Sequence, residues 1–206
     1  MSSVYLHIGK YFLLMVNVFT KPEKRKIYWK LIVQEIDKIG LQSLGIVALL
    51  SLFMGAVVTL QTAANIDSGW IPRWTIGYTT RQTMILEFSS TIVCLILSGK
   101  VGGNISSEIG TMRITEQIDA LEVMGINPSS YLVLPKVIAS LIMYPLLVIL
   151  AGILSLTGGY LVGTLLGIMS PQDFIFGIRD GFNPYTIQFA LIKSFVFAYL
   201  ISSISS

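Results

Sequence analysis

Residues 41–60 read LQSLGIVALLSLFMGAVVTL and contain no charged side chain. An α-helix needs about twenty consecutive, mainly apolar residues to cross a bilayer, and this segment supplies them. Charged residues make up only 12% of the chain, against about 25% in soluble domains. We therefore expect an all-α integral membrane protein, with no room for an independent soluble domain.

Four segments have the apolar character of spans. They cover residues 41–61, 83–101, 133–169 and 186–206. The third would reach about 55 Å as one helix, against a hydrocarbon core of about 30 Å, so we expect a bend or break at Pro145, Gly152 or Gly158–Gly159. The stretch between the first two spans carries Trp70, Trp74 and Tyr78, which suit an aromatic belt near one surface. Residues 170–185 read as a polar loop.

We expect residues 1–40 to form a separate N-terminal segment and residues 41–206 to form the transmembrane domain. Within 21–40, apolar residues recur at helical spacing and charged residues share the rest of the surface. This pattern predicts a helix lying in the headgroup region, with Tyr28 and Trp29 at the interface. A helix packed on a partner is the alternative.

Lysine and arginine predict the orientation. Three arginines fall on one side: Arg73, Arg81 and Arg179. Ten cations fall on the side of the N-terminus and of the connection at about 102–132: Lys10, Lys21, Lys24, Arg25, Lys26, Lys30, Lys38, Lys100, Arg113 and Lys136. The positive-inside bias places the N-terminus and that connection in the cytoplasm.

The connection contains EIGTMRITEQIDALEVMGINP, residues 108–128, with four acidic residues and one basic residue. We expect a helix at about 110–124 that ends at Gly125, after which Asn127 and Pro128 cap and begin the next helix. Its acidic side would be repelled by anionic headgroups, so a protein partner suits it better. The alternative is a connector that only satisfies its own caps.

Catalytic and metal-binding residues are not expected. Cys94 is the only cysteine and His7 the only histidine, which leaves no disulfide and no cysteine-based metal site. The spans contain no paired carboxylates and no serine–histidine set. Gly99-Lys100 is not part of a P-loop, because Val101 follows and no glycine stands five residues before Gly99. ATP-driven work would therefore need a separate nucleotide-binding subunit, and no nucleic-acid partner is predicted.

The connection, together with LPKVIA at 134–139, closely resembles the signature of the MlaE/YrbE family. These are permease subunits of lipid-transporting ABC systems that work with MCE proteins. LIKSFVFA at 191–198 and GKVGG at 99–103 also match, and the resemblance covers the chain from about residue 12 onward.

The resemblance implies an interfacial N-terminal helix, five spans, a symmetric permease dimer in the inner membrane and a connection helix that docks on the cytoplasmic ATPase. The implied ATPase-coupling residues are Glu108, Gly110, Arg113, Thr115, Glu116, Gln117, Asp119, Leu121, Glu122 and Gly125.

Two features depart from the family pattern. Family members often carry Arg-Glu-Leu-Gly-Pro in the second span, where this chain has LEFSS at 86–90 and keeps only Glu87. The family's fifth span is missing after SSISS, which suggests a truncated chain.

Two charges lie within predicted spans. Glu87 and Lys193 sit at comparable depth, so they can pair, either as a structural salt bridge or as a polar lining for a lipid headgroup. Gly159, Gly163 and Gly167 recur every four residues and predict close helix packing, within the chain or near a dimer interface.

The function that these features favour is that of a permease subunit moving phospholipid or a related lipid, non-catalytic by itself. Its expected partners are an ABC ATPase that binds the ATP, an MCE-domain protein and a second permease copy. A secondary transporter and a membrane scaffold without transport are the alternatives.

Overall fold

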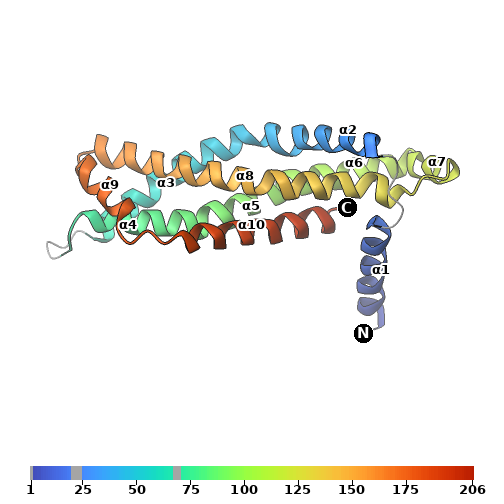
Figure 1. Ribbon diagram of the computed structural model, residues 1–206, viewed down its shortest axis with the longest axis horizontal. Helices are drawn as coiled ribbons and strands as arrows, with labels where there is room; N and C mark the ends of the chain where they lie inside the picture. The colour runs from blue at the N-terminus through green and yellow to red at the C-terminus, as the bar shows by residue number, and fades with distance from the viewer. Residues whose placement is uncertain (1, 20–24, 67–70) are drawn as a thin grey trace. The chain divides into compact units, whose positions relative to one another are not determined.

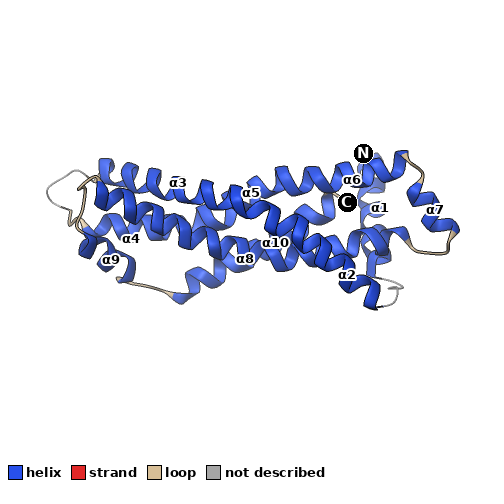
Figure 2. Cartoon of the chain, turned by 90° about the horizontal axis from the view of Figure 1, so that it is seen from above, coloured by secondary structure: helices blue, strands red, loops and turns tan. Residues whose placement is uncertain are grey.

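The structure is a computed structural model that describes residues 2–19, 25–66 and 71–206. Every regular element in these residues is a helix (Figures 1 and 2). In chain order they are α1 (Ser2–Phe19), α2 (Arg25–Ile36), η1 (Asp37–Leu41), α3 (Gln42–Asn65), α4 (Trp74–Thr83), η2 (Met84–Ile92), α5 (Val93–Leu97), η3 (Ser98–Gly102), α6 (Gly103–Ile114), α7 (Gln117–Val123), α8 (Pro128–Leu165), α9 (Pro171–Arg179) and α10 (Pro184–Ile204). The η segments are π-helical.

Four continuous helices among the described residues are long and apolar enough to cross a membrane: Tyr28–Asn65, Trp74–Ile114, Pro128–Leu165 and Pro184–Ile204. They contain the first two predicted spans, all but the last four residues of the third and all but the last two of the fourth, so the all-α multi-pass membrane fold is confirmed. The first three have 38, 41 and 38 residues. At 1.5 Å per residue each is about 57 Å or longer, well beyond the hydrocarbon core.

This length corrects the expected break in the third span. α8 is a single helix of 38 residues that passes through Pro145, Gly152 and Gly158–Gly159 without interruption. The bilayer imposes no break, because a helix longer than the hydrocarbon core can extend beyond it into the interfacial region. The predicted division at residue 40 likewise lies within a continuous helix, since η1 joins α2 to α3 with no residue between them.

The chain divides into two compact units. Unit 1 comprises residues 1–42, 97–143 and 198–206, and unit 2 comprises residues 43–96 and 144–197. In unit 1, α1 packs through Met15 and Val18 against Val133 and Val137 of α8. Its Tyr11 hydroxyl donates to the Ser203 hydroxyl oxygen at 2.7 Å.

The α2 helix is also tied into unit 1. Tyr28 is buried, and its hydroxyl oxygen lies 2.8 Å from that of Ser130 in α8. Tyr28 therefore packs inside the protein, whereas Trp29 is exposed, and the predicted headgroup position of this helix stays a prediction.

Unit 2 is built on close contact between α3 and α8. A Cβ on Gly55 would overlap the backbone of Ser155, and one on Gly158 would overlap the backbone of Leu52. Gly159 faces Thr59, whose hydroxyl donates to the Gly55 carbonyl oxygen at 2.8 Å. These contacts are the small-residue packing that lets helices approach closely in membranes.

The predicted glycine stripe is only partly involved in this packing. A Cβ on Gly163 would lie 3.4 Å from Cγ2 of Thr59, which is ordinary contact. Gly167 lies beyond the end of α8 with φ +66°, and a Cβ there would meet nothing within 4 Å. It is the left-handed residue of a helix stop, because the Ile168 amide bonds to the Gly163 carbonyl oxygen at 3.1 Å. The four-residue spacing alone could not distinguish these roles.

A helical corner in unit 2 replaces the predicted polar loop at 170–185. Ser170 caps α9, accepting from the Asp173 amide at 3.1 Å, and Pro171 occupies the first helical position. α9 lies beside α4 (Figure 1), with the Trp74 and Phe176 rings in an edge-to-face contact at 5.6 Å. Trp70 of the predicted aromatic belt falls outside the described residues.

Arg81 stabilises this corner. Its guanidinium is buried and donates to the carbonyl oxygens of Ile178 at 2.6 Å and Asp180 at 2.9 Å. It also stacks on the Tyr78 ring at 4.9 Å. From the sequence alone, Arg81 was only one of three charges that indicated the orientation.

Candidate functional site

The predicted connection at about 102–132 contains α6, which is the C-terminal end of the second long helix, and a separate short helix, α7, instead of one helix at about 110–124. α6 ends at Ile114, and Thr115 and Glu116 separate it from α7. Glu116 adopts φ +58° and is the only non-glycine residue with a positive φ among the described residues. The Thr115 hydroxyl and amide both bond to the Thr111 carbonyl oxygen, at 2.8 and 3.0 Å, which closes the last turn of α6.

The end of α7 follows the prediction. Gly125 has φ +76°, its amide bonds to the Glu122 carbonyl oxygen at 2.9 Å, and the Ile126 amide bonds to the Leu121 carbonyl oxygen at 3.0 Å. These two bonds form a Schellman motif, which glycine favours because it lacks a Cβ. Asn127 then caps α8, accepting from the Ser129 amide at 3.2 Å.

The surface of this connection carries exposed apolar side chains. α7 has no buried residue. Ile114 and Val123 are 85% and 89% exposed, and Met124 is exposed as well. Of the predicted coupling residues, Arg113, Thr115, Glu116, Gln117, Asp119, Glu122 and Gly125 are exposed, whereas Glu108, Gly110 and Leu121 are half-buried. Exposed apolar residues next to carboxylates give this surface the mixed character of a protein-binding site.

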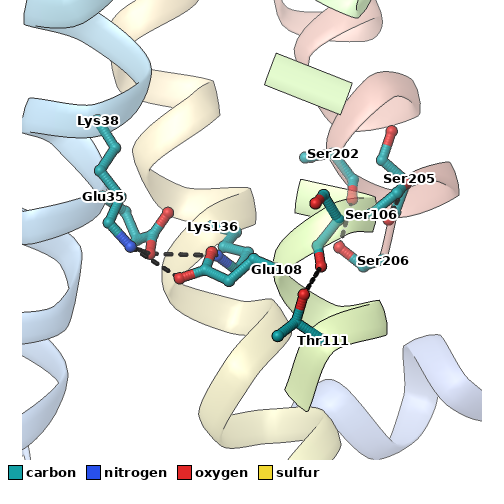
Figure 3. Close-up of polar contacts among 10 residues, drawn as sticks. Glu35, Lys38, Ser106, Glu108, Thr111, Lys136, Ser202, Ser205 and Ser206 are labelled. Carbon is teal, nitrogen blue, oxygen red and sulfur yellow. Dashed lines mark hydrogen bonds and ion pairs between the residues drawn. The ribbon is translucent and has the colours of Figure 1, made fainter. Parts of the chain in front are cut away.

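Glu108 has intramolecular partners, and its predicted role in ATPase coupling stays a prediction. Its carboxylate pairs with Lys38 of η1 at 2.8 Å and also with Lys136 of α8. Lys136 also pairs with the carboxylate of Glu35 in α2 at 3.2 Å. The same Glu35 carboxylate lies 3.5 Å from the Lys38 ammonium. Figure 3 shows these four residues, here called the charge cluster, converging from three parts of unit 1.

Burial makes the charge cluster more than a surface ion pair. The Lys136 side chain is 4% exposed and that of Glu35 is 11% exposed. A charge so removed from water persists only when partners offset its desolvation, which is what the opposing carboxylates do. Sequence reasoning treated Lys136 only as one of ten orientation charges. The sequence feature that could have indicated its burial is its position within the apolar run LPKVIASL.

A cavity of about 690 Å³ adjoins the charge cluster within unit 1. Its lining includes Glu35, Lys38, Gln42, Asn104, Glu108 and Thr111. The cavity lies between part of α6 and the α2–η1 helix, so these helices are incompletely packed against each other there.

Glu87 and Lys193 form the second charged site, in unit 2. The Glu87 carboxylate and the Lys193 ammonium are 3.5 Å apart, so the predicted pairing is present. Lys193 also donates to the Leu86 carbonyl oxygen at 3.1 Å, and its ammonium lies 5.2 Å from the centre of the Phe189 ring. The Glu87 side chain remains 64% exposed and is therefore accessible to another polar group.

A π-helical segment occupies the position where the family has a glycine–proline pair. η2 contains Glu87, and the hydroxyls of Ser89 and Ser90 donate to the carbonyl oxygens of Ile85 and Leu86 at 2.9 and 2.8 Å. Wide π turns disturb the regular helical hydrogen-bond ladder and are frequent at functional sites. The Leu86 carbonyl oxygen thus accepts from both Ser90 and Lys193.

Comparison with known proteins decides the family. The family model described as Permease MlaE matches residues 32–206. The chain belongs to the MlaE permease family. A probable ABC transporter permease protein of Rickettsia bellii is 33% identical over 198 residues, covering 96% of this chain and 76% of its own length.

Other MlaE-family relatives come from different lineages. The intermembrane phospholipid transport system permease protein MlaE of Haemophilus influenzae is 32% identical over 152 residues, 74% of this chain and 58% of its own. The chloroplastic protein TRIGALACTOSYLDIACYLGLYCEROL 1 of Arabidopsis thaliana is 31% identical over 182 residues, 88% of this chain and 52% of its own.

Membership of the MlaE family confirms the resemblance drawn from residues 108–128 and 134–139. The roles assigned to single residues in the connection and in the membrane stay predictions, because family membership does not test them.

Proposed function

We propose that this MlaE-family chain is the permease subunit of an ABC-type lipid transporter, with phospholipid as the first candidate substrate. The observation that carries the proposal is the exposed surface formed by the end of α6 and by α7. Relatives named as ABC transporter permeases and as a phospholipid transport permease support it.

The α7 surface is the proposed docking site for the ATPase. Ile114, Val123 and Met124 would lose contact with water on docking. Asp119 and Glu122 supply carboxylates for basic groups of the partner, and the same charges disfavour contact with anionic lipid. ATP binds to and is hydrolysed by this partner, so the chain itself supplies neither a catalytic residue nor a cofactor.

The Glu87–Lys193 pair is the proposed polar contact for the lipid headgroup. A zwitterionic headgroup carries a phosphate and an ammonium, which match the lysine and the glutamate respectively. A charge within a span is stable when it faces water, protein or another polar group, and the exposed Glu87 carboxylate needs such a partner.

The remaining components follow from the family resemblance and the charge bias. An MCE-domain protein receives or delivers the lipid, and a second copy of the permease completes the transporter. The excess of lysine and arginine near the N-terminus and residues 102–132 supports insertion in the inner membrane with both segments in the cytoplasm.

The experiment that tests the proposal removes the charge match at α7. The full chain is purified with its ATPase, and ATPase retention and lipid transfer between vesicles are measured. The double variant Asp119→Lys and Glu122→Lys is expected to lower ATPase retention about tenfold or more, because two like-charge contacts at an interface cost several kcal/mol.

Asp180→Lys is the control for charge reversal, since it makes one such acid-to-lysine change, half that of the double variant, in the connection after α9. It is expected to retain the ATPase at the wild-type level. Wild-type retention and lipid transfer in the double α7 variant would refute docking at this surface. If the wild-type complex retains the ATPase fully but transfers no lipid, the result would instead favour a membrane scaffold without transport.

A further inference from the structure

The charge cluster joins the helices on either side of α7, which is called the docking segment below. Glu108 is on α6, which leads into the docking segment, and Lys136 is on α8, which leaves it. Glu35 and Lys38 are on the α2–η1 helix, near the start of the first long helix. Each of the two lysines pairs with both glutamates, so four ion pairs link the three helices.

Few other contacts hold α6 in place. Ile105 is its single buried residue, although the helix has 12 residues. Ser106 adds one polar contact, donating from its hydroxyl to the Ser205 carbonyl oxygen at 2.9 Å. The cavity of about 690 Å³ occupies the space beside Asn104, Ser107 and Thr111. α6 continues the second long helix, and beside that continuity Ile105, Ser106 and Glu108 hold it to its neighbours among the described residues.

Glu108 is well placed to transmit a displacement of the docking segment. It lies six residues before Ile114, the last residue of α6, and the intervening helix is continuous. A helical rod moves as one body, so a shift at the docking surface reaches the Glu108 carboxylate. The carboxylate can pass that shift to the nearly buried Lys136 of α8, where water screens the interaction weakly.

We infer that Lys136 is a positioning residue for energy coupling, which through Glu108 and Glu35 ties the movement of the docking segment to α8 and to the α2–η1 helix. This inference rests on the proposed function, because it assumes that an ATPase moves α7. Lys136 is nearly buried and is not part of the exposed docking surface. Its role is to make lipid movement depend on ATP hydrolysis.

The test compares Lys136→Met with wild type in the complete complex of the full chain and its ATPase. Three quantities are measured: ATPase retained per permease, ATP hydrolysed, and lipid transferred between phospholipid vesicles per ATP. Lys136→Met is expected to retain the ATPase, because α7 is unchanged. Lipid transferred per ATP is expected to fall about fivefold or more, the lower end of typical coupling interactions.

Further variants separate positioning from general damage. Lys136→Arg keeps the charge and is expected to restore most of the lipid transferred per ATP. Glu108→Gln and the double variant Glu108→Gln with Lys136→Met are expected to lose about as much as Lys136→Met alone, since all three remove one shared contact. Lys30→Met, on the exposed side of α2, and Asp37→Asn, in η1, are matched controls with wild-type ratios expected.

Some outcomes overturn the inference. A wild-type lipid-to-ATP ratio in Lys136→Met would do so, as would an equal loss in Lys30→Met. If Lys136→Met fails to fold, the half-exposed Lys38→Met takes its place, and an unchanged ratio in both Lys38→Met and Glu108→Gln counts against the cluster. If the α7 variants release the ATPase while Lys136→Met couples normally, the proposed function stands and only this inference fails.

Discussion

At the scale of single residues, Glu116 has two features that can be tested separately: its backbone conformation and its carboxylate. It marks the boundary between α6 and α7 with φ +58°. A left-handed conformation costs most residues roughly 1–2 kcal/mol, and asparagine tolerates it better than others. The family resemblance assigned Glu116 to ATPase coupling through its carboxylate, whereas the structure gives it a conformational role as well.

Two substitutions distinguish these roles. Glu116→Asn removes the charge and favours the left-handed turn, so it is expected to retain the ATPase at near-wild-type levels. Glu116→Val disfavours the turn by roughly 1–2 kcal/mol and is expected to weaken retention about tenfold. Co-purification of the ATPase measures both. If Glu116→Asn and Glu116→Val lose the ATPase equally, the carboxylate is the essential feature.

At the scale of elements, the contact between α3 and α8 in unit 2 depends on glycines that meet backbone atoms. A Cβ on Gly55 would overlap the carbonyl group of Ser155, and a rigid backbone cannot yield as a flexible side chain can. By contrast, a Cβ on Gly45, also on α3, would meet nothing within 4 Å. One helix thus contains both a packing glycine and a glycine free of such contacts.

Gly55→Ala is therefore expected to lower the free energy of unfolding by about 1–3 kcal/mol, the usual cost of overpacking. Gly45→Ala serves as the matched control and is expected to be neutral or to stabilise by about 0.5–1 kcal/mol, because alanine favours the helix. Thermal unfolding of the detergent-solubilised protein compares them. Equal stability of the two variants would contradict the close approach of α3 and α8.

The elements also show what the sequence could predict. The charge-free windows predicted the spans, and Gly125, Asn127 and Pro128 predicted the end of α7 and the start of α8, because caps depend on neighbouring residues. The Glu108–Lys136 pair was missed because its members are 28 residues apart. Such a contact depends on helix packing that local patterns do not encode. α9 could have been found, since Ser170, Pro171 and Asp173 form a helix-start pattern.

At the scale of the whole molecule, helix length and charge distribution predict the arrangement across the membrane. Three long helices exceed the hydrocarbon core, and charged residues lie near one end of each: Glu35 and Lys38, Glu108 and Arg113, and Lys136. Charged side chains are costly within hydrocarbon, so we expect these ends to lie at or beyond the cytoplasmic interface. We therefore expect α7 to lie in the cytoplasm and the connection after α9 to face the opposite side of the membrane.

Single-cysteine labelling tests this topology with little background, because Cys94 is the only native cysteine and is buried. Asp180→Cys is expected to react with a membrane-impermeant maleimide in intact spheroplasts, since its connection faces outward. Gln117→Cys, on the exposed surface of α7, is expected to react only after the membrane is permeabilised, which also serves as the control that the cysteine is accessible. Labelling of Gln117→Cys in intact spheroplasts would place the docking segment outside the cytoplasm. A cytosolic ATPase could not then bind it, and the proposed transport mechanism would have to be abandoned.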